Sequence, residues 1–129
     1  MLNSKTIFVT GGTGSFGKTF IQTVLERYKP EKVIVYSRDE LKQYEMQISE
    51  VFQSEKNVGN VRYLIGDVRD KDRLKLAMEG VDFVIHAAAL KQIPTAEYNP
   101  FEAVKTNIIG AENVLEAAYK NKVKRAIVL

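Results

Sequence analysis

Hydrophobic positions in this chain alternate between two patterns: short apolar runs, and longer stretches with apolar residues three or four apart. The short runs predict strands over residues 6–10, 32–37, 61–66, 82–86 and 125–129. Most of these runs are continuously apolar, as in Val33-Ile34-Val35-Tyr36, instead of alternating with polar residues. Continuous runs are typical of parallel strands that helices cover on both faces of the sheet.

Helical spacing between the runs predicts helices over residues 15–28, 39–53, 71–78 and 101–121. The residues expected to face the core are, in the first helix, Phe16, Phe20, Ile21, Val24, Leu25 and Tyr28; in the more polar second helix, Leu41, Tyr44, Ile48 and Val51; and in the last, Val104, Ile108, Val114, Leu115 and Ala118. Alternating strands and helices with right-handed crossovers predict a doubly wound parallel sheet (a Rossmann fold) in the order 3-2-1-4-5. Residues 1–129 are therefore expected to form one α/β domain.

Composition and charge exclude several classes of protein. The 129 residues contain no cysteine, which excludes a disulfide framework and is compatible with the cytoplasm. No apolar stretch reaches the roughly 18 residues of a membrane span, and the N-terminus has no signal-peptide pattern. The net charge of +3 is dispersed, without a platform of aromatic residues, so we expect no nucleic-acid binding. We also predict no metal site.

The segment TGGTGSFGKTF follows the first predicted strand and opens the first predicted helix. Gly11 is expected to permit the sharp bend, Gly14 to leave room for a phosphate, and Gly17 to let the helix pack closely. The helix start offers unpaired N–H groups and the positive end of the helix dipole. This segment predicts a pyrophosphate site in a dinucleotide-binding unit; the alternative is a flexible turn without a ligand.

The end of the second predicted strand bears on the choice between NAD and NADP. Many NAD-binding domains place an acidic residue there, which binds the ribose 2′-OH. This chain has Ser37 followed by Arg38, and Lys42 lies one turn into the next helix. The two cations favour a 2′-phosphate and hence NADP. Two alternatives stay open: Asp39 as a ribose ligand of NAD, and a structural capping box made by Ser37 and Glu40.

Two further strand ends carry candidate residues. After the third strand, the carboxylate of Asp67 can accept a hydrogen bond from the exocyclic amine of adenine, and Val68 can cover the ring. The alternative for Asp67 is the N-cap of the following helix. After the fourth strand, the alanines at 87–89 leave room for a cofactor, although packing alone also explains small residues. His86, the only histidine, is interpreted as structural.

Four segments, TGGTGSFGKTF, YSRDELKQYEM, GDVRDKDRL and HAAALKQIPTAEYNPFEAVKTNIIGAENV, resemble the N-terminal half of extended short-chain dehydrogenases/reductases. Within that family, the sequence is similar to bacterial UDP-N-acetylglucosamine 4,6-dehydratases of flagellin-glycan and capsule synthesis. The resemblance covers essentially the whole chain, and its most specific segments are TGSFG, SRDELK and LKQIPTAEYNP. Gln92 stands where the family often has histidine, which leaves the stereochemistry at sugar C5 open.

The glycine pattern and the resemblance together imply an extended NADP site. Its expected residues are Gly11, Thr13, Gly14, Ser15, Phe16 and Gly17 at the phosphates; Ser37, Arg38, Asp39, Glu40, Leu41 and Lys42 at the adenosine phosphate; Asp67 and Val68 at the adenine; and Ala87 along the cofactor. Lys91 is implied where the nicotinamide and the UDP-sugar meet. The implied reaction is an internal redox cycle: NADP+ takes hydride from sugar C4, water leaves across C5–C6, and the hydride returns to C6.

The acid–base residues of the family, a Thr-Asp-Lys segment and a Tyr-x-x-x-Lys pair, are expected beyond Leu129. The literal match from Tyr28 to Lys32 contains Pro30 and precedes a strand, on the side opposite the ligand crevice, so we reject it. We therefore expect a truncated chain that binds NADP without turning over UDP-sugar, from a homo-oligomeric cytoplasmic enzyme. The alternatives are a non-catalytic NADP(H)-binding module, and a sugar-nucleotide epimerase or reductase.

Overall fold

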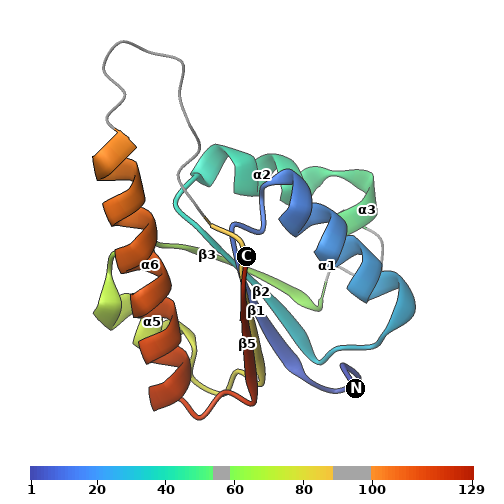
Figure 1. Cartoon of the computed structure of the whole chain (residues 1–129). Coiled ribbons are helices and arrows are strands. Elements are labelled where there is room, and N and C mark those ends of the chain that lie inside the picture. The colour runs from blue at the N-terminus through green and yellow to red at the C-terminus, as the bar shows by residue number, and fades with distance from the viewer. Residues whose placement is uncertain (54–58, 89–99) are drawn as a thin grey trace.

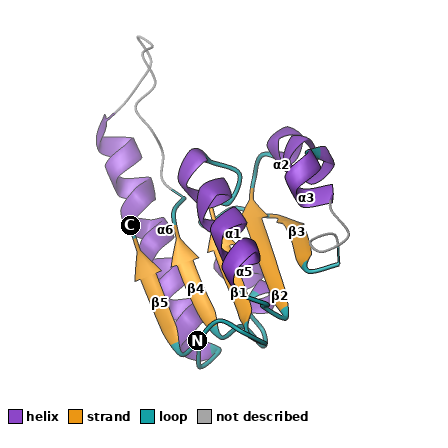
Figure 2. Cartoon of the chain, turned by 90° about the vertical axis from the view of Figure 1, so that its right-hand side faces the viewer, coloured by secondary structure: helices purple, strands orange, loops and turns teal. Residues whose placement is uncertain are grey.

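The structure is a computed structural model that describes residues 1–53, 59–88 and 100–129. Its strands are β1 (Thr6–Thr10), β2 (Lys32–Ser37), β3 (Val61–Ile65), β4 (Phe83–His86) and β5 (Arg125–Val128). They form one parallel sheet in the order β3-β2-β1-β4-β5, and Figure 2 shows them side by side. The predicted fold class and strand order are confirmed.

Helices cover both faces of this sheet (Figure 1). On one face lie α1 (Ser15–Arg27), α2 (Glu40–Ile48) and α3 (Glu50–Gln53), and on the other lie α5 (Lys71–Ala77) and α6 (Pro100–Lys120). Neighbouring residues of a strand point to opposite faces, so the continuous apolar runs supply two cores at once. In β1, Ile7 and Val9 pack under α1, whereas Phe8 packs with Leu74 of α5 and Val114 of α6.

The predicted inward face of the second helix is wrong. The helix is divided into α2 and α3, and the exposed side chains include Leu41, Tyr44 and Ile48, while Gln43, Met46 and Phe52 are buried. The side chain of Val51 lies outside the described residues. The cause is the amide of Gln43, which donates to the backbone oxygens of Ser37 and Leu64 at 3.2 and 2.8 Å. Those bonds link the ends of β2 and β3 to α2 and fix which face of the helix is inside.

The outer positions of α1 also differ from the expectation. Ile21, Val24 and Leu25 are buried as predicted, but Phe16 is exposed and its ring stacks on Phe20 at 6.2 Å between centroids. Tyr28, the C-cap residue, is exposed as well. The helix approaches the strands through Gly17, which is buried in its first turn.

In α6, small residues face the sheet and large ones face outward. Of the residues expected inside, Val114 and Ala118 are buried, while Val104, Ile108 and Leu115 are exposed. The inner face is completed by Ala103, Gly110 and Ala117, which allow a close approach to the sheet layer. The outer face carries an exposed apolar stripe at helical spacing, defined by Phe101, Val104, Ile108, Leu115 and Tyr119. The strand β5, at the edge of the sheet, is exposed along its length.

Candidate functional site

A cleft of about 360 Å³ opens at the carboxyl ends of the parallel strands. It is lined by Gly11, Thr13, Gly14, Tyr36, Ser37, Arg38, Asp39, Lys42, Gly66, Asp67, Val68, Ala87, Ala88, Thr106, Asn107 and Gly110. Most of the predicted cofactor residues therefore surround one cavity. Among those predicted, Ser15, Phe16, Gly17, Glu40 and Leu41 are not part of this lining, and Lys91 lies outside the described residues. The crevice beyond the carboxyl ends of the strands is where open α/β sheets bind ligands.

Two glycines of the turn are required by the fold, independently of any ligand. Gly11 has a φ of 69°, and a Cβ there would lie 2.7 Å from the backbone nitrogen of Ala88, two residues after β4. A Cβ on Gly17 would collide with the backbone of Gly11 and Gly12. Gly11 thus serves the bend and Gly17 the packing of α1, in agreement with the roles predicted for them.

Gly14 differs, because the protein leaves space for a side chain there. A Cβ on Gly14 would meet only the carbonyl oxygen of Gly11, at an ordinary 3.4 Å, and its φ of −77° suits any residue. Yet Gly14 lines the cleft and is the N-cap of α1. The described residues provide no side-chain cap for this helix start and no acidic residue in its first turn. The helix therefore directs its positive end toward the cleft, where the protein itself leaves space beside Gly14.

At the end of β2 the structure shows which residue caps the following helix. Asp39 is the N-cap of α2, and its side chain accepts a hydrogen bond from the backbone N–H of Lys42 at 3.0 Å. The alternative of a capping box made by Ser37 and Glu40 is therefore wrong: Ser37 ends β2, and its hydroxyl oxygen accepts from Gln43 at 3.0 Å. A strand that continues to residue 37 moves the start of the helix two residues further along the chain.

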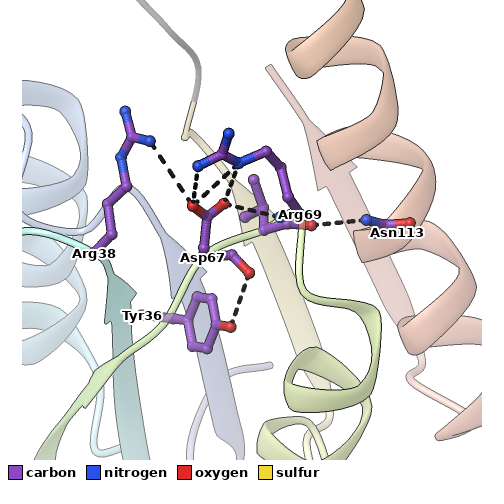
Figure 3. Close-up of polar contacts among 6 residues, drawn as sticks. Tyr36, Arg38, Asp67, Arg69 and Asn113 are labelled. Carbon is purple, nitrogen blue, oxygen red and sulfur yellow. Dashed lines mark hydrogen bonds and ion pairs between the residues drawn. The ribbon is translucent and has the colours of Figure 1, made fainter.

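Asp67, at the end of β3, binds a pair of arginines (Figure 3). Arg69 donates to both carboxylate oxygens, with its Nη2 2.7 Å from Oδ2 and its Nε 3.1 Å from each oxygen, and its backbone N–H also donates to Oδ1 at 2.9 Å. Arg38 approaches from the other side, with its Nη1 3.8 Å from Oδ2. The hydrogen bonds from the Arg69 side chain lower the pKa of Asp67 below its ordinary value. Asp67 is not the N-cap of α5; Asp70 has that role.

The backbone after β3 is fixed by side chains from two other elements (Figure 3). The hydroxyl of Tyr36 donates to the carbonyl oxygen of Asp67 at 3.1 Å, and the amide of Asn113 on α6 donates to that of Val68 at 3.0 Å. Burial raises the pKa of Tyr36 to about 12, so the hydroxyl stays a donor near neutral pH. Gly110 brings α6 close to this segment, since a Cβ there would lie 2.7 Å from the Val68 side chain.

His86 has a structural partner and does not line the cleft. Its Nδ1 lies 2.6 Å from the hydroxyl oxygen of Thr10, which also accepts hydrogen bonds from the backbone N–H groups of Ala87 and Ala88 at 3.1 and 3.2 Å. Because that oxygen already accepts twice, the Thr10 hydroxyl donates to Nδ1, and the proton of the neutral imidazole is on Nε2. Burial lowers the pKa of His86. This arrangement agrees with a structural role for His86, and it fixes the backbone that follows β4.

The sequence reasoning did not find the wall of the cleft that α6 provides. Thr106, Asn107 and Gly110 lie in the middle of this helix and line the cavity. The sequence signal that could have revealed this wall was Gly110, because a glycine inside a helix lowers helix stability by about 1 kcal/mol relative to alanine. The structure explains this glycine by the close contact of α6 with Val68. No cluster of potential metal ligands occurs within residues 1–53, 59–88 and 100–129, and none of the helices described there could cross a membrane.

Comparison with known proteins agrees with this fold. The family described as "Polysaccharide biosynthesis protein" matches residues 7–129. All of this chain aligns, at 60% identity, with 37% of a Campylobacter jejuni UDP-N-acetylglucosamine 4,6-dehydratase (inverting), and at 47% identity with 37% of a Rickettsia typhi UDP-glucose 4-epimerase. In the X-ray structure of Pen from Bacillus thuringiensis, 46% identical, 99% of this chain superimposes on 37% of that chain with a TM-score of 0.85. The chain thus spans little more than a third of these relatives.

Proposed function

Because the chain belongs to this polysaccharide biosynthesis protein family, we propose that it is the NADP-binding part of a nucleotide-sugar 4,6-dehydratase acting on UDP-N-acetylglucosamine. The 60% identity to the Campylobacter jejuni dehydratase supports the reaction and the substrate. The proposed cofactor site depends on one observation: the start of α1 at Gly14 has no side-chain cap and lies at the carboxyl ends of the strands. The proposal applies to a parent enzyme that contains this chain.

The residues that line the cleft fit a dinucleotide. The backbone N–H groups at the start of α1 would bind the pyrophosphate, and the missing Cβ of Gly14 leaves the space for it. Val68, which α6 holds through Asn113 and Gly110, would cover the adenine. Each oxygen of Asp67 already accepts two hydrogen bonds from Arg69, so its proposed contact with the adenine amine would share an oxygen with Arg69 or replace one of these bonds.

NADP is favoured over NAD by the charges at the end of β2. Arg38 and Lys42 line the cleft beside Ser37, and a guanidinium binds a phosphate with charge-assisted hydrogen bonds. Asp39 is the ribose ligand that NAD would need, but its carboxylate caps α2. A bound NADP would supply the hydride acceptor for sugar C4 and the hydride donor for C6. The described residues hold and orient the dinucleotide, and we assign no proton transfer to them.

Two alternatives keep the same fold and cleft. The 47% identity to the Rickettsia typhi UDP-glucose 4-epimerase supports an epimerase, in which the same cofactor site serves a different sugar reaction. A non-catalytic dinucleotide-binding module would use the cleft without a sugar site. Activity of the parent enzyme separates them: a dehydratase forms a 4-keto-6-deoxy sugar, an epimerase forms the C4 epimer, and a module forms neither.

The proposal is tested by titration calorimetry of this chain with NADP+, NAD+ and UDP-N-acetylglucosamine. We expect NADP+ to bind more tightly than NAD+, and UDP-N-acetylglucosamine alone to give no heat, since Lys91 is the one sugar contact expected in this chain and the proton-transfer residues are expected elsewhere in the parent. Absence of binding by either dinucleotide would contradict the cofactor site. Tighter binding of NAD+ would instead favour Asp39 as the ribose ligand.

We further propose that the parent enzyme is a homo-oligomer that associates through the exposed apolar stripe of α6. Exposed apolar patches of this kind often mark interfaces. The large side chains of the stripe face away from the sheet, and Phe101 and Tyr119 at its ends are more than four-fifths exposed.

A further inference from the structure

Asp67 creates an electrostatic problem for the proposed cofactor. Its carboxylate lines the same cleft as Arg38, and the two groups are 3.8 Å apart. A cofactor phosphate bound by Arg38 would therefore have a negatively charged carboxylate as a close neighbour. Like charges at such distances repel, and Asp67 also competes with the phosphate for the guanidinium of Arg38.

Arg69 is placed to remove both effects. It engages both oxygens of Asp67 with its Nε and Nη2, which is the bidentate geometry that binds carboxylates most strongly. Its backbone N–H adds a further bond to Oδ1, so the side chain and the turn are fixed relative to each other. By comparison, Arg38 makes a single long contact to Oδ2 and is half exposed. The pairing in this structure is thus unequal: Asp67 is bound to Arg69, and Arg38 is only loosely held.

We propose that Arg69 is a specificity-determining residue that acts through Asp67. It neutralises the carboxylate and leaves Arg38 available for the ribose 2′-phosphate of NADP. Without Arg69, Asp67 would hold Arg38 more closely and repel the phosphate. NAD, which has a hydroxyl at that position, would lose little. The inference rests on the proposed cofactor site and concerns only its preference for the phosphorylated dinucleotide.

A competing explanation is that Arg69 contacts the 2′-phosphate directly. The two explanations differ in what happens when Asp67 is made neutral. If Arg69 acts through Asp67, its removal matters only while the carboxylate is charged. If it binds the phosphate itself, its removal costs the same in either background. A double-mutant cycle therefore separates them.

The experiment measures the dissociation constants of NADP+ and NAD+ for wild-type chain, Arg69→Gln, Asp67→Asn and the double variant. Their ratio is the readout, because adenine and pyrophosphate contacts are common to both dinucleotides and cancel. We expect Arg69→Gln to reduce the preference for NADP+ about tenfold, as one lost charge-assisted contact would. In the Asp67→Asn background the same substitution should change the ratio by less than about twofold.

Arg73→Gln is the matched control. Arg73 lies on α5, its guanidinium donates to the carbonyl oxygen of Ile65 at 2.7 Å, and it also carries one positive charge near the cleft. We expect this variant to keep the wild-type ratio. An equal effect of Arg69→Gln with and without the Asp67 charge, or no effect on the ratio at all, would overturn the inference while leaving the cofactor site intact. If the wild-type chain binds neither dinucleotide, the proposed function and this inference both fall.

Discussion

Thr10 and His86 form the shortest described side-chain contact next to the cleft, 2.6 Å between the hydroxyl oxygen and Nδ1. The hydroxyl donates to the ring and accepts from the backbone N–H groups that follow β4. A protonated imidazole would have no lone pair on Nδ1 and would break this contact. The backbone conformation directly after β4 therefore depends on a neutral His86.

Acidification should weaken the fold through His86. Burial lowers its pKa below the ordinary 6.5, so the unfolded chain binds the proton more readily than the folded one. The stabilising contribution is fully present above pH 6.5 and is lost as the pH falls from there through the folded-state pKa. Urea unfolding at pH 7.5 and at more acidic values measures it. His86→Asn, whose amide oxygen can accept from Thr10 without titrating, should lack this part of the pH dependence; an identical slope in both proteins would contradict the assignment.

Replacing Gly14 by alanine should weaken dinucleotide binding without unfolding the chain. The new Cβ meets only the Gly11 carbonyl oxygen, at 3.4 Å, but it projects into the space proposed for the pyrophosphate. We expect affinity for NADP+ to fall by about tenfold or more, roughly 1.4 kcal/mol, with the melting temperature unchanged or higher. Gly17→Ala is the contrasting variant: its Cβ collides with the turn backbone, so it should cost about 1–3 kcal/mol of stability. Unchanged binding by the Gly14 variant would exclude the proposed position of the phosphate.

Arg38→Ala should weaken NADP+ far more than NAD+. A hydrogen bond to a charged group contributes about 1.5–3 kcal/mol, so the affinity for NADP+ should fall roughly 10- to 100-fold. NAD+ has no 2′-phosphate and should change by less than about threefold. Calorimetric titration with both dinucleotides decides the point. Equal losses for the two cofactors would mean that Arg38 does not bind the 2′-phosphate.

Tyr36→Phe tests whether the hydrogen bond from the Tyr36 hydroxyl stabilises the segment after β3. The variant keeps the ring, which packs on Phe8 with centroids 5.2 Å apart, and removes only the bond to the Asp67 carbonyl oxygen. Loss of one such bond should lower the free energy of unfolding by about 0.5–1.5 kcal/mol. Hydrogen exchange of the amides around Asp67 should accelerate as well. Wild-type protection in this turn would show that the Asn113 bond suffices.

Self-association through α6 should depend on the apolar stripe. Ile108→Glu places a charge at its centre on an exposed position, so we expect folding to be preserved and association to be lost. Sedimentation velocity over a range of concentrations measures the effect. Tyr44→Glu is the control, because Tyr44 is similarly exposed on α2 at the opposite face of the sheet. A monomeric wild-type chain at high concentration would refute the proposal for this chain.

The strands and the glycine turn could be predicted from the sequence because their signals are local. An apolar run such as Val33–Tyr36 fills both cores, and the turn needs Gly11 for its backbone and Gly17 for its packing. The helix faces could not be predicted from hydrophobicity alone. A polar side chain, Gln43, fixes the inner face of α2, because its amide satisfies backbone oxygens at the strand ends.

The N-cap residues differ from the alternatives considered in the sequence for a related reason. Ser37 and Asp67 have the right chemistry for N-caps, but each still belongs to the strand end or the turn after it, and Asp39 and Asp70 cap the helices instead. Capping depends on where the strand stops, which its composition does not specify. The α6 wall of the cleft is a tertiary feature: Thr106 reaches the cavity only because small residues bring the helix close to the sheet.

The single helix α6 has two different surfaces on opposite sides. Its inner side closes the cleft with Thr106 and holds Val68 through Asn113, and its outer side carries the apolar stripe. A displacement of this helix would change both surfaces at once. If association at the outer side displaced α6, it would change the affinity for the proposed dinucleotide, and dinucleotide binding would change association by the same factor.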